Sequence, residues 1–265
     1  MIEVFVGCSA NGEDAESLMV LEYSMKKHTD REVNITHMML GSDETWSNWN
    51  TQTWATPFSG FRWTIPEHMG FKGQGIYMDS DMIILSDIGE LWDQEFQPGK
   101  VVLAKGSKGG EGWRYCVCKW NNETAGEYIF PLNRMKQLPQ SHQRMMALFA
   151  SNQNIVQPFE GNWNCIDGEN LPIDEIDILH YSDMSTQMHL KYAMPRLSEN
   201  NQHHWFDGNI REHWRKDLVD LFEQYYKEAL DSGYKVEDYI PENMFGEYSK
   251  ESQANYDRYR NQWSK

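Results

Sequence analysis

Residues 73–93, GQGIYMDSDMIILSDIGELWD, place two aspartates inside an otherwise apolar run. The flanks of Asp79 and Asp81, GIYM before and MIIL after, are typical of a buried strand and too apolar for a solvated edge. A buried carboxylate without a partner is costly, so we expect a positive partner for both side chains. A divalent cation held by oxygen ligands is the best-qualified partner.

The spacing of the two aspartates also predicts where the strand ends. Side chains two residues apart in an extended strand share a face but lie about 6.6 Å apart along the chain. Ligands of one small cation lie about 2.0–2.2 Å from it. We therefore expect the chain to turn off the strand at Ser80, so that both acids converge at the carboxyl edge of the sheet. Open α/β sheets bind their ligands at this edge.

The N-terminal pattern predicts an α/β fold. An apolar run at 2–9, an amphipathic segment at 15–28 and a second apolar run at 32–40 form a strand, helix and strand, which indicates a mostly parallel sheet. We expect one domain over residues 1–195 and a helical extension over 196–265 packed on the same domain. The later elements expected are helices at 56–69 (closed by Pro66), 134–150 and 210–234 (ended by Gly233), and strands at 100–106, 114–120 and 174–183.

Composition excludes some classes of partner. The 265 residues carry a formal charge of −16, which argues against a nucleic-acid or anionic-membrane surface. No signal peptide and no apolar run of about 20 residues is apparent, so we expect a cytoplasmic protein without stable membrane insertion. The four cysteines match neither a zinc ribbon nor a disulfide framework, and Cys116 and Cys118 are interpreted as strand packing.

Two other readings of the aspartate pair are weak. A haloacid dehalogenase-type phosphatase has its Asp-x-Asp near the N-terminus and needs a downstream acidic pair. Here the pair begins at Asp79, and no Asp-Asp dipeptide occurs in the chain. An EF-hand is excluded because DSDMII lacks the glycine and the other oxygen ligands of that loop.

Residues 56–93 resemble retaining nucleotide-sugar glycosyltransferases of the GT-A fold, especially glycosyltransferase family 8 and its phage and bacterial relatives. In that family an arginine precedes Ile-Pro by three positions, a strand then ends in Asp-x-Asp, and an acidic turn follows, as at Arg62, Ile65, Asp79 and Asp87 here. The similarity covers about residues 2–190. It includes the Trp-Asn pair at 163–164 and a late strand-end histidine, His180.

The resemblance implies a Rossmann-like, mostly parallel central sheet flanked by helices. It also implies transfer of a hexose, with glucose or galactose as the best candidates, from a UDP-sugar to a hydroxyl of an unknown glycan, lipid or protein. Asp79, Asp81 and His180 would hold the metal, and a histidine ligand favours Mn²⁺ over Mg²⁺. The residues expected to bind the nucleotide-sugar are Val6, Gly7, Cys8, Ser9, Arg62, Asp79, Ser80, Asp81, Gln187 and Lys191.

The sequence departs from the family at two places. Asp183 and Thr186 replace a glycine and the lysine that binds the diphosphate, and Lys191 or Arg196 are candidates for the missing cation. At the family's Asp-Gln-Asp motif the chain has Ser141-His142-Gln143. His142, Gln143 and Asp167 are the candidate catalytic residues that line the sugar pocket.

A second function remains open at this stage, namely a non-catalytic carbohydrate-binding protein on a degenerate transferase fold. Such a protein would bind glycans through aromatic rings. Trp46, Trp49 and Trp54 either stack on an acceptor or pack as a loop on the core. The sequence leaves the oligomeric state open.

Overall fold

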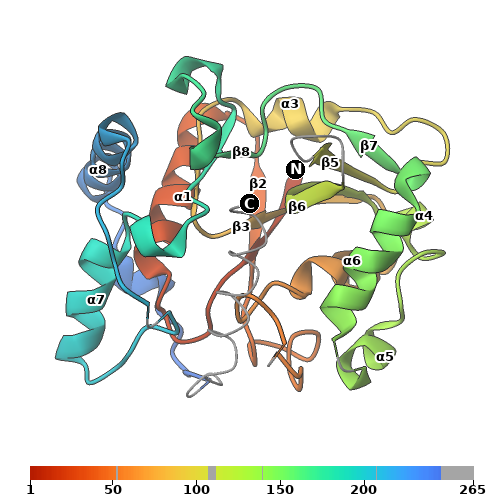
Figure 1. The fold of residues 1–265 in the computed structure, drawn as a ribbon, viewed down its shortest axis with the longest axis horizontal. Helices are drawn as coiled ribbons and strands as arrows, with labels where there is room; N and C mark the ends of the chain where they lie inside the picture. Colours follow the sequence, from red (N-terminus) through yellow and green to blue (C-terminus); the bar gives the residue numbers. More distant parts are fainter. Residues whose placement is uncertain (52, 107–111, 139, 207, 246–265) are drawn as a thin grey trace.

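A computed structural model describes residues 1–51, 53–106, 112–138, 140–206 and 208–245, and its centre is a six-stranded sheet (Figure 1). The strands lie in the order β2-β1-β3-β6-β5-β7. β6 is antiparallel to both β3 and β5, whereas the other pairings in this sheet are parallel. Five strands therefore share one direction, which confirms the mostly parallel sheet. The strands are β1 (Ile2–Gly7), β2 (Val33–Met38), β3 (Gln74–Asp79), β5 (Val102–Gly106), β6 (Trp113–Asn121) and β7 (Val156–Pro158).

A second, three-stranded sheet brings a late part of the chain to the end of β3. It has the order β4-β9-β8, with β4 (Met82–Ile84), β8 (Cys165–Ile166) and β9 (Ile178–His180). β4 and β9 are antiparallel, and their register places Met82 opposite His180. The amide of Tyr181 also donates to the carbonyl of Asp81 at 3.0 Å. The segment after Asp79 thus leaves the central sheet and pairs beside the late histidine.

Helices cover both sides of the central sheet. In Figure 1, α1, α7 and α8 lie to the left of the sheet and α4, α5 and α6 to the right. α1 contacts both α7 and α8, so the C-terminal helices pack on the first helix of the fold. α7 runs across residue 195, where the sequence analysis placed the boundary of the C-terminal extension. That boundary stays a prediction. The helices are α1 (Ala15–His28), α2 (Ile65–His68), α3 (Ile88–Asp93), α4 (Asn122–Ala125), α5 (Leu132–Gln137), α6 (Ser141–Ser151), α7 (Leu190–Glu199) and α8 (Lys216–Asp231).

Three expected helices differ from the structure. The segment at 56–69 contains only a 3₁₀ turn (Phe61–Trp63) and α2, and Pro66 lies in the first turn of α2. Proline opens a helix there because the first turn needs no amide donor, so the expectation that Pro66 closes one was wrong. The expected 134–150 helix is divided into α5 and α6, with Gln140 in the left-handed region (φ 58°). α8 begins at Lys216 rather than 210, but Gly233 follows its end with φ 91°, as a helix stop requires.

The tryptophans of residues 46–54 belong to the core. Trp46, Trp49 and Trp54 are 2%, 8% and 0% exposed. Trp49 and Trp54 pack against each other and against Phe61, with ring centroids 5.3–5.8 Å apart. Of the two open interpretations, packing on the core is therefore confirmed. No helix in the described part of the chain is long and apolar enough to cross a bilayer.

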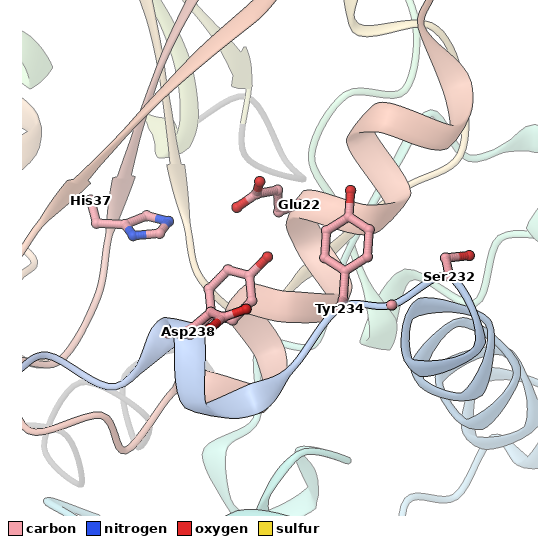
Figure 2. Close-up of a pocket in the computed structure, with 7 residues that line it drawn as sticks. Glu22, His37, Ser232, Tyr234 and Asp238 are labelled. Carbon is pink, nitrogen blue, oxygen red and sulfur yellow. The ribbon is translucent and has the colours of Figure 1, made fainter.

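A cavity of about 440 Å³ lies between α1, β2 and the segment that follows α8 (Figure 2). Glu22, His37, Tyr234, Asp238 and Tyr239 contribute to its walls. None of the site residues expected from the sequence lines this cavity. Asp79, the first aspartate of the expected site, lies instead at the end of β3.

Candidate active site

Asp79 is the last residue of β3 and is held by two neighbours. Tyr77, two positions earlier on the same face of the strand, donates its hydroxyl to Asp79 Oδ1. Arg62 Nη2 lies 3.2 Å from the same oxygen. Because both contacts use Oδ1, Oδ2 remains the oxygen that can bind a cation.

Arg62 is itself fixed by its surroundings. Its Nε donates to the carbonyl of Ser59 at 2.8 Å, and its guanidinium lies 4.6 Å from the ring centroid of Tyr77. Burial by itself disfavours the charge, but Tyr77 and Asp79 outweigh it and raise the pKa of Arg62 above its usual range. The side chain therefore stays a cation at the edge of the site.

Asp81 lies two residues after Asp79 and contacts His180 of the second sheet. Its Oδ1 is 3.2 Å from His180 Nε2, and its Oδ2 accepts from the side-chain amide of Gln187. Gln187 also donates to the carbonyl of Tyr181 at 2.8 Å. Burial alone would lower the pKa of His180, but the charge of Asp81 raises it well above its usual value. The contact with Asp81 therefore favours the protonated imidazole, and a bound metal would compete with that proton.

The donor atoms that lie closest together include one that the sequence did not predict. Single donor atoms of Asp79, Cys116 and His180 all lie within 4.8 Å of one another. Asp81 is outside this group and contacts His180 from its Nε2 side. Cys116 lies on β6, which is antiparallel to β3. Val117 is opposite Met78, so the next pair in this register places Cys116 beside Asp79. Cys116 packs against the core from a strand, as expected, but its half-buried side chain also reaches the site.

These residues fit a divalent cation. His180 is 5% exposed, and its Nδ1 has no hydrogen-bond partner among the described residues. Carboxylate oxygens and an imidazole nitrogen are ligands of Mn²⁺ and other first-row metals. The end of β3 therefore contains a group of residues that can hold a metal ion.

The end of β1 lies beside the end of β3. Gly7 is opposite Asp79 in the parallel register of the two strands. A Cβ on Gly7 would lie 2.6 Å from the hydroxyl of Tyr77, so only glycine fits there. The side chains of Val6 and Cys8 are buried in the core, and the amide of Ser9 donates to Asp14 at 2.7 Å. Backbone groups are thus what this segment can offer to a nucleotide.

His142 and Gln143 hold the aromatic core together. His142 Nδ1 accepts the indole N–H of Trp63 at 2.9 Å, and Gln143 donates to the carbonyl of Thr53. Burial, with a smaller effect of the charge on Arg62, lowers the pKa of His142 to about 3. His142 is therefore a neutral acceptor. A role in lining the sugar pocket stays a prediction for both residues.

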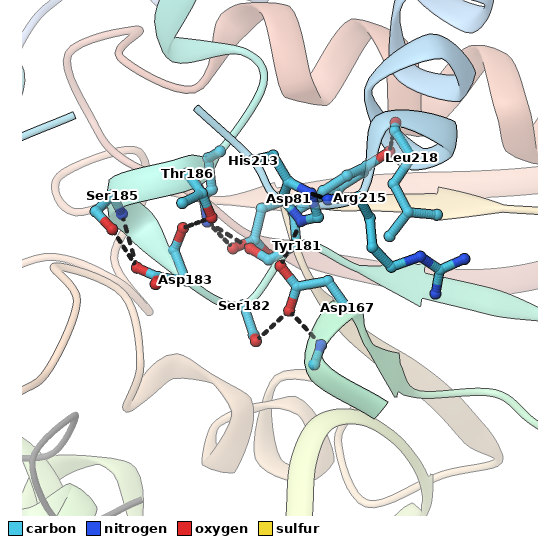
Figure 3. A network of polar contacts seen from close by, with 12 residues as sticks. Asp81, Asp167, Tyr181, Ser182, Asp183, Ser185, Thr186, His213, Arg215 and Leu218 are labelled. Atoms are coloured by element: carbon cyan, nitrogen blue, oxygen red, sulfur yellow. Dashed lines mark hydrogen bonds and ion pairs between the residues drawn. The ribbon is translucent and has the colours of Figure 1, made fainter. Parts of the chain in front are cut away.

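Asp167 anchors the loops next to the site (Figure 3). It accepts hydrogen bonds from Ser182 Oγ at 2.9 Å, from the Gly168 amide at 3.0 Å and from His213 Nε2 at 3.1 Å. His213 Nδ1 accepts the amide of Arg215, so its proton is on Nε2 and points to Asp167. No pattern in the sequence pointed to His213, because its contact with Asp167 joins segments 46 positions apart. Direct contact of Asp167 with a sugar stays a prediction.

The candidates for the missing cation are engaged elsewhere. Lys191 forms an exposed ion pair with Glu223 of α8 at 2.9 Å. Arg196 binds Glu16 through Nε and Nη2. The cation that lies on the 183–186 loop is Arg211, which donates to Asp183 Oδ2 at 3.1 Å and to the hydroxyl of Ser185 at 2.8 Å.

A second cluster of possible ligands lies at the start of α1. Asp14, His189 and His204 are buried, with single donor atoms within 4.8 Å of one another. His204 Nδ1 accepts the amide of Phe206 at 2.9 Å, so its proton is on Nε2. With one nitrogen engaged and the other protonated, His204 does not suit a cation.

Comparison with known proteins identifies the fold. No protein-family model matches the sequence, and no curated protein matches it in sequence. The pneumococcal glycosyltransferase GlyE of Streptococcus pneumoniae TIGR4 superposes with a TM-score of 0.58 at 13% identity, over 93% of this chain and 67% of that one. The galactosyltransferase LgtC, solved with donor and acceptor sugar analogs, gives 0.56 at 11% identity over 86% and 96%.

The bifunctional glycosyltransferase WbbM gives a TM-score of 0.55 at 12% identity over 87% of this chain. The chain spans only 51% of the length of WbbM. At these identities the likeness concerns the fold alone. The central sheet with its single reversed strand, the Asp-x-Asp at the end of β3 and these structural neighbours together show that the chain has the GT-A glycosyltransferase fold.

Proposed function

We propose that this protein is a metal-dependent retaining glycosyltransferase that moves glucose or galactose from a UDP-sugar to a hydroxyl acceptor. The observation that carries the proposal is the meeting of Asp79, Asp81 and His180 at the end of β3, beside the fixed cation of Arg62. This arrangement supplies what the departure of a nucleoside diphosphate needs, namely positive charge beside a developing anion.

Each residue has a defined task in this proposal. A bound Mn²⁺ or Mg²⁺ supplies Lewis-acid stabilisation of the leaving diphosphate. Asp79 and His180 would hold it, while Gln187 fixes the carboxylate of Asp81. Arg62, whose guanidinium lies beside Asp79, would bind phosphate or sugar oxygens. Backbone groups at the end of β1, where Gly7 lies opposite Asp79, would contact the nucleotide.

The direct test is release of UDP. The protein is incubated with UDP-glucose or UDP-galactose and Mn²⁺, and UDP is measured with and without EDTA. We expect metal-dependent release, and its absence with every common nucleotide-sugar would contradict the proposal. Asp81→Ala and His180→Ala should abolish this activity, whereas His203→Ala, at an exposed position, should leave it unchanged.

The carbohydrate-binding alternative has less support from the residues. Its stacking surface would have needed rings such as Trp46, Trp49 and Trp54, which are buried. Calorimetry separates the two functions, because a lectin binds glycans without nucleotide or metal. A phosphatase would instead release inorganic phosphate from phosphomonoesters.

The donor can be identified from the increase in the protein's thermal stability that a bound ligand causes. Thermal unfolding with a panel of nucleotide-sugars identifies the donor, since a bound ligand raises the melting temperature by mass action. The acceptor can be a glycan, a lipid or a protein hydroxyl. A cytoplasmic location stays a prediction.

A further inference from the structure

We propose that Cys116 is a ligand of the metal centre, where its sulfur binds the cation together with Asp79 and His180. The inference rests on the metal-dependent function proposed above. It differs from the ligand set expected from the sequence, in which two aspartates and a histidine bind the ion and Cys116 has no role.

The position of Cys116 on β6 brings its sulfur to the candidate metal site. Cys116 lies on β6, the reversed strand next to β3, and its sulfur is within 4.8 Å of donor atoms of both Asp79 and His180. Its side chain is half-buried, whereas Cys8, Cys118 and Cys165 are buried in the core. Among the four cysteines, Cys116 is thus the one whose sulfur belongs to the group of donor atoms at Asp79 and His180 in the described residues.

The two neighbours of Cys116 each have a ligand atom that no hydrogen bond described above uses. His180 directs Nε2 to Asp81, and its buried Nδ1 has no hydrogen-bond partner in the described part of the chain. Asp79 binds Arg62 and Tyr77 through Oδ1 and leaves Oδ2. An oxygen, a nitrogen and a sulfur atom therefore converge, and a cation bound between them would satisfy all three.

A sulfur ligand changes which metal the site prefers. Thiolates bind Zn²⁺, Co²⁺ and Cd²⁺ well, whereas Mg²⁺ prefers oxygen ligands throughout. We therefore expect tighter binding of Co²⁺ and Zn²⁺ than of Mg²⁺. Replacing Cys116 with serine should weaken Co²⁺ binding by about tenfold or more and reduce the preference over Mg²⁺.

The test uses Co²⁺ as a spectroscopic probe on the metal-free full chain. A cobalt–thiolate bond produces charge-transfer absorption in the near ultraviolet, independently of any activity. The band should appear on titration of the wild-type protein, disappear in Cys116→Ser and persist in Cys118→Ala, a matched control two positions along the same strand. Equilibrium dialysis measures Co²⁺ binding in each protein.

A labelling experiment on the wild-type chain does not depend on the folding of any variant. Bound Co²⁺ should protect Cys116 from iodoacetamide, as quantified by peptide mass spectrometry. Bound Co²⁺ without the charge-transfer band, or without protection, would overturn the assignment of Cys116 and leave the proposed function standing. Absence of any metal binding would overturn both.

Discussion

Arg62→Met tests whether the buried ion pair at the end of β3 supports the fold as well as the site. The side chains of Arg62 and Asp79 are only 8% and 13% exposed, so water cannot replace the lost cation. Breaking one partner of a buried pair costs about 3–5 kcal/mol. The lost hydrogen bond to Ser59 adds about 1 kcal/mol. We expect the free energy of unfolding to fall by about 4–6 kcal/mol, and the melting temperature by about 8–24 °C.

Urea unfolding of the metal-free protein measures this loss of stability. Two further variants test whether the loss comes from the buried ion pair. In an Asp79→Asn background the carboxylate is already neutral, so Arg62→Met should cost about 2–3 kcal/mol less than in the wild type. Arg31→Met is the matched control, because its partner Asp93 is 66% exposed and the pair contributes about 0–1 kcal/mol. Equal losses in both backgrounds, or equal losses for Arg62 and Arg31, would refute the reasoning.

Three further predictions concern other buried groups. Burial, then a neighbouring acid, raises the pKa of Glu13 to about 7. Its protonated form favours the fold, so wild-type stability should fall between about pH 4.5 and 7 by about 3 kcal/mol, relative to Glu13→Gln, in urea titrations with EDTA. Burial lowers the pKa of Lys119 to about 8, so the unfolded chain binds more protons and stability should rise between about pH 8 and 10.5. Lys119→Met should lack this rise, and an identical pH profile in the variant would contradict it. Gly60→Ala should destabilise by about 1–3 kcal/mol or more, because the new Cβ would lie 2.3 Å from the buried ring of Trp54. Gly168→Ala, whose Cβ meets nothing within 4 Å, is its control, and equal melting temperatures would count against the clash.

The features predictable from the sequence are those encoded over short distances. The β1-α1-β2 unit follows from alternation of apolar runs and an amphipathic segment. The end of a strand at Asp79 followed from two charges in an apolar run, and the structure has this strand end. The stop at Gly233 likewise depends on a few neighbouring residues.

Features that depend on strand order and register were not predictable. Nothing in residues 113–121 indicates that β6 inserts between β3 and β5 in the opposite direction. That insertion places Cys116 alongside Asp79 at the end of β3, whereas Cys118, on the same face of β6, lies further into the sheet opposite Tyr77. The contact between Asp167 and His213 likewise arises from the tertiary fold.

The pairing of β4 with β9 has a consequence for the order of folding events. Gln187 lies 106 positions after Asp81, so the site closes only when two distant parts of the chain have met. Contacts of such long range form late, because loop closure costs entropy before any contact repays it. We therefore expect a metal ion that needs His180 to bind after the rate-limiting step of folding. Such an ion should slow unfolding and leave the folding rate nearly unchanged. It would therefore increase the kinetic stability of the native state without helping the chain to reach it.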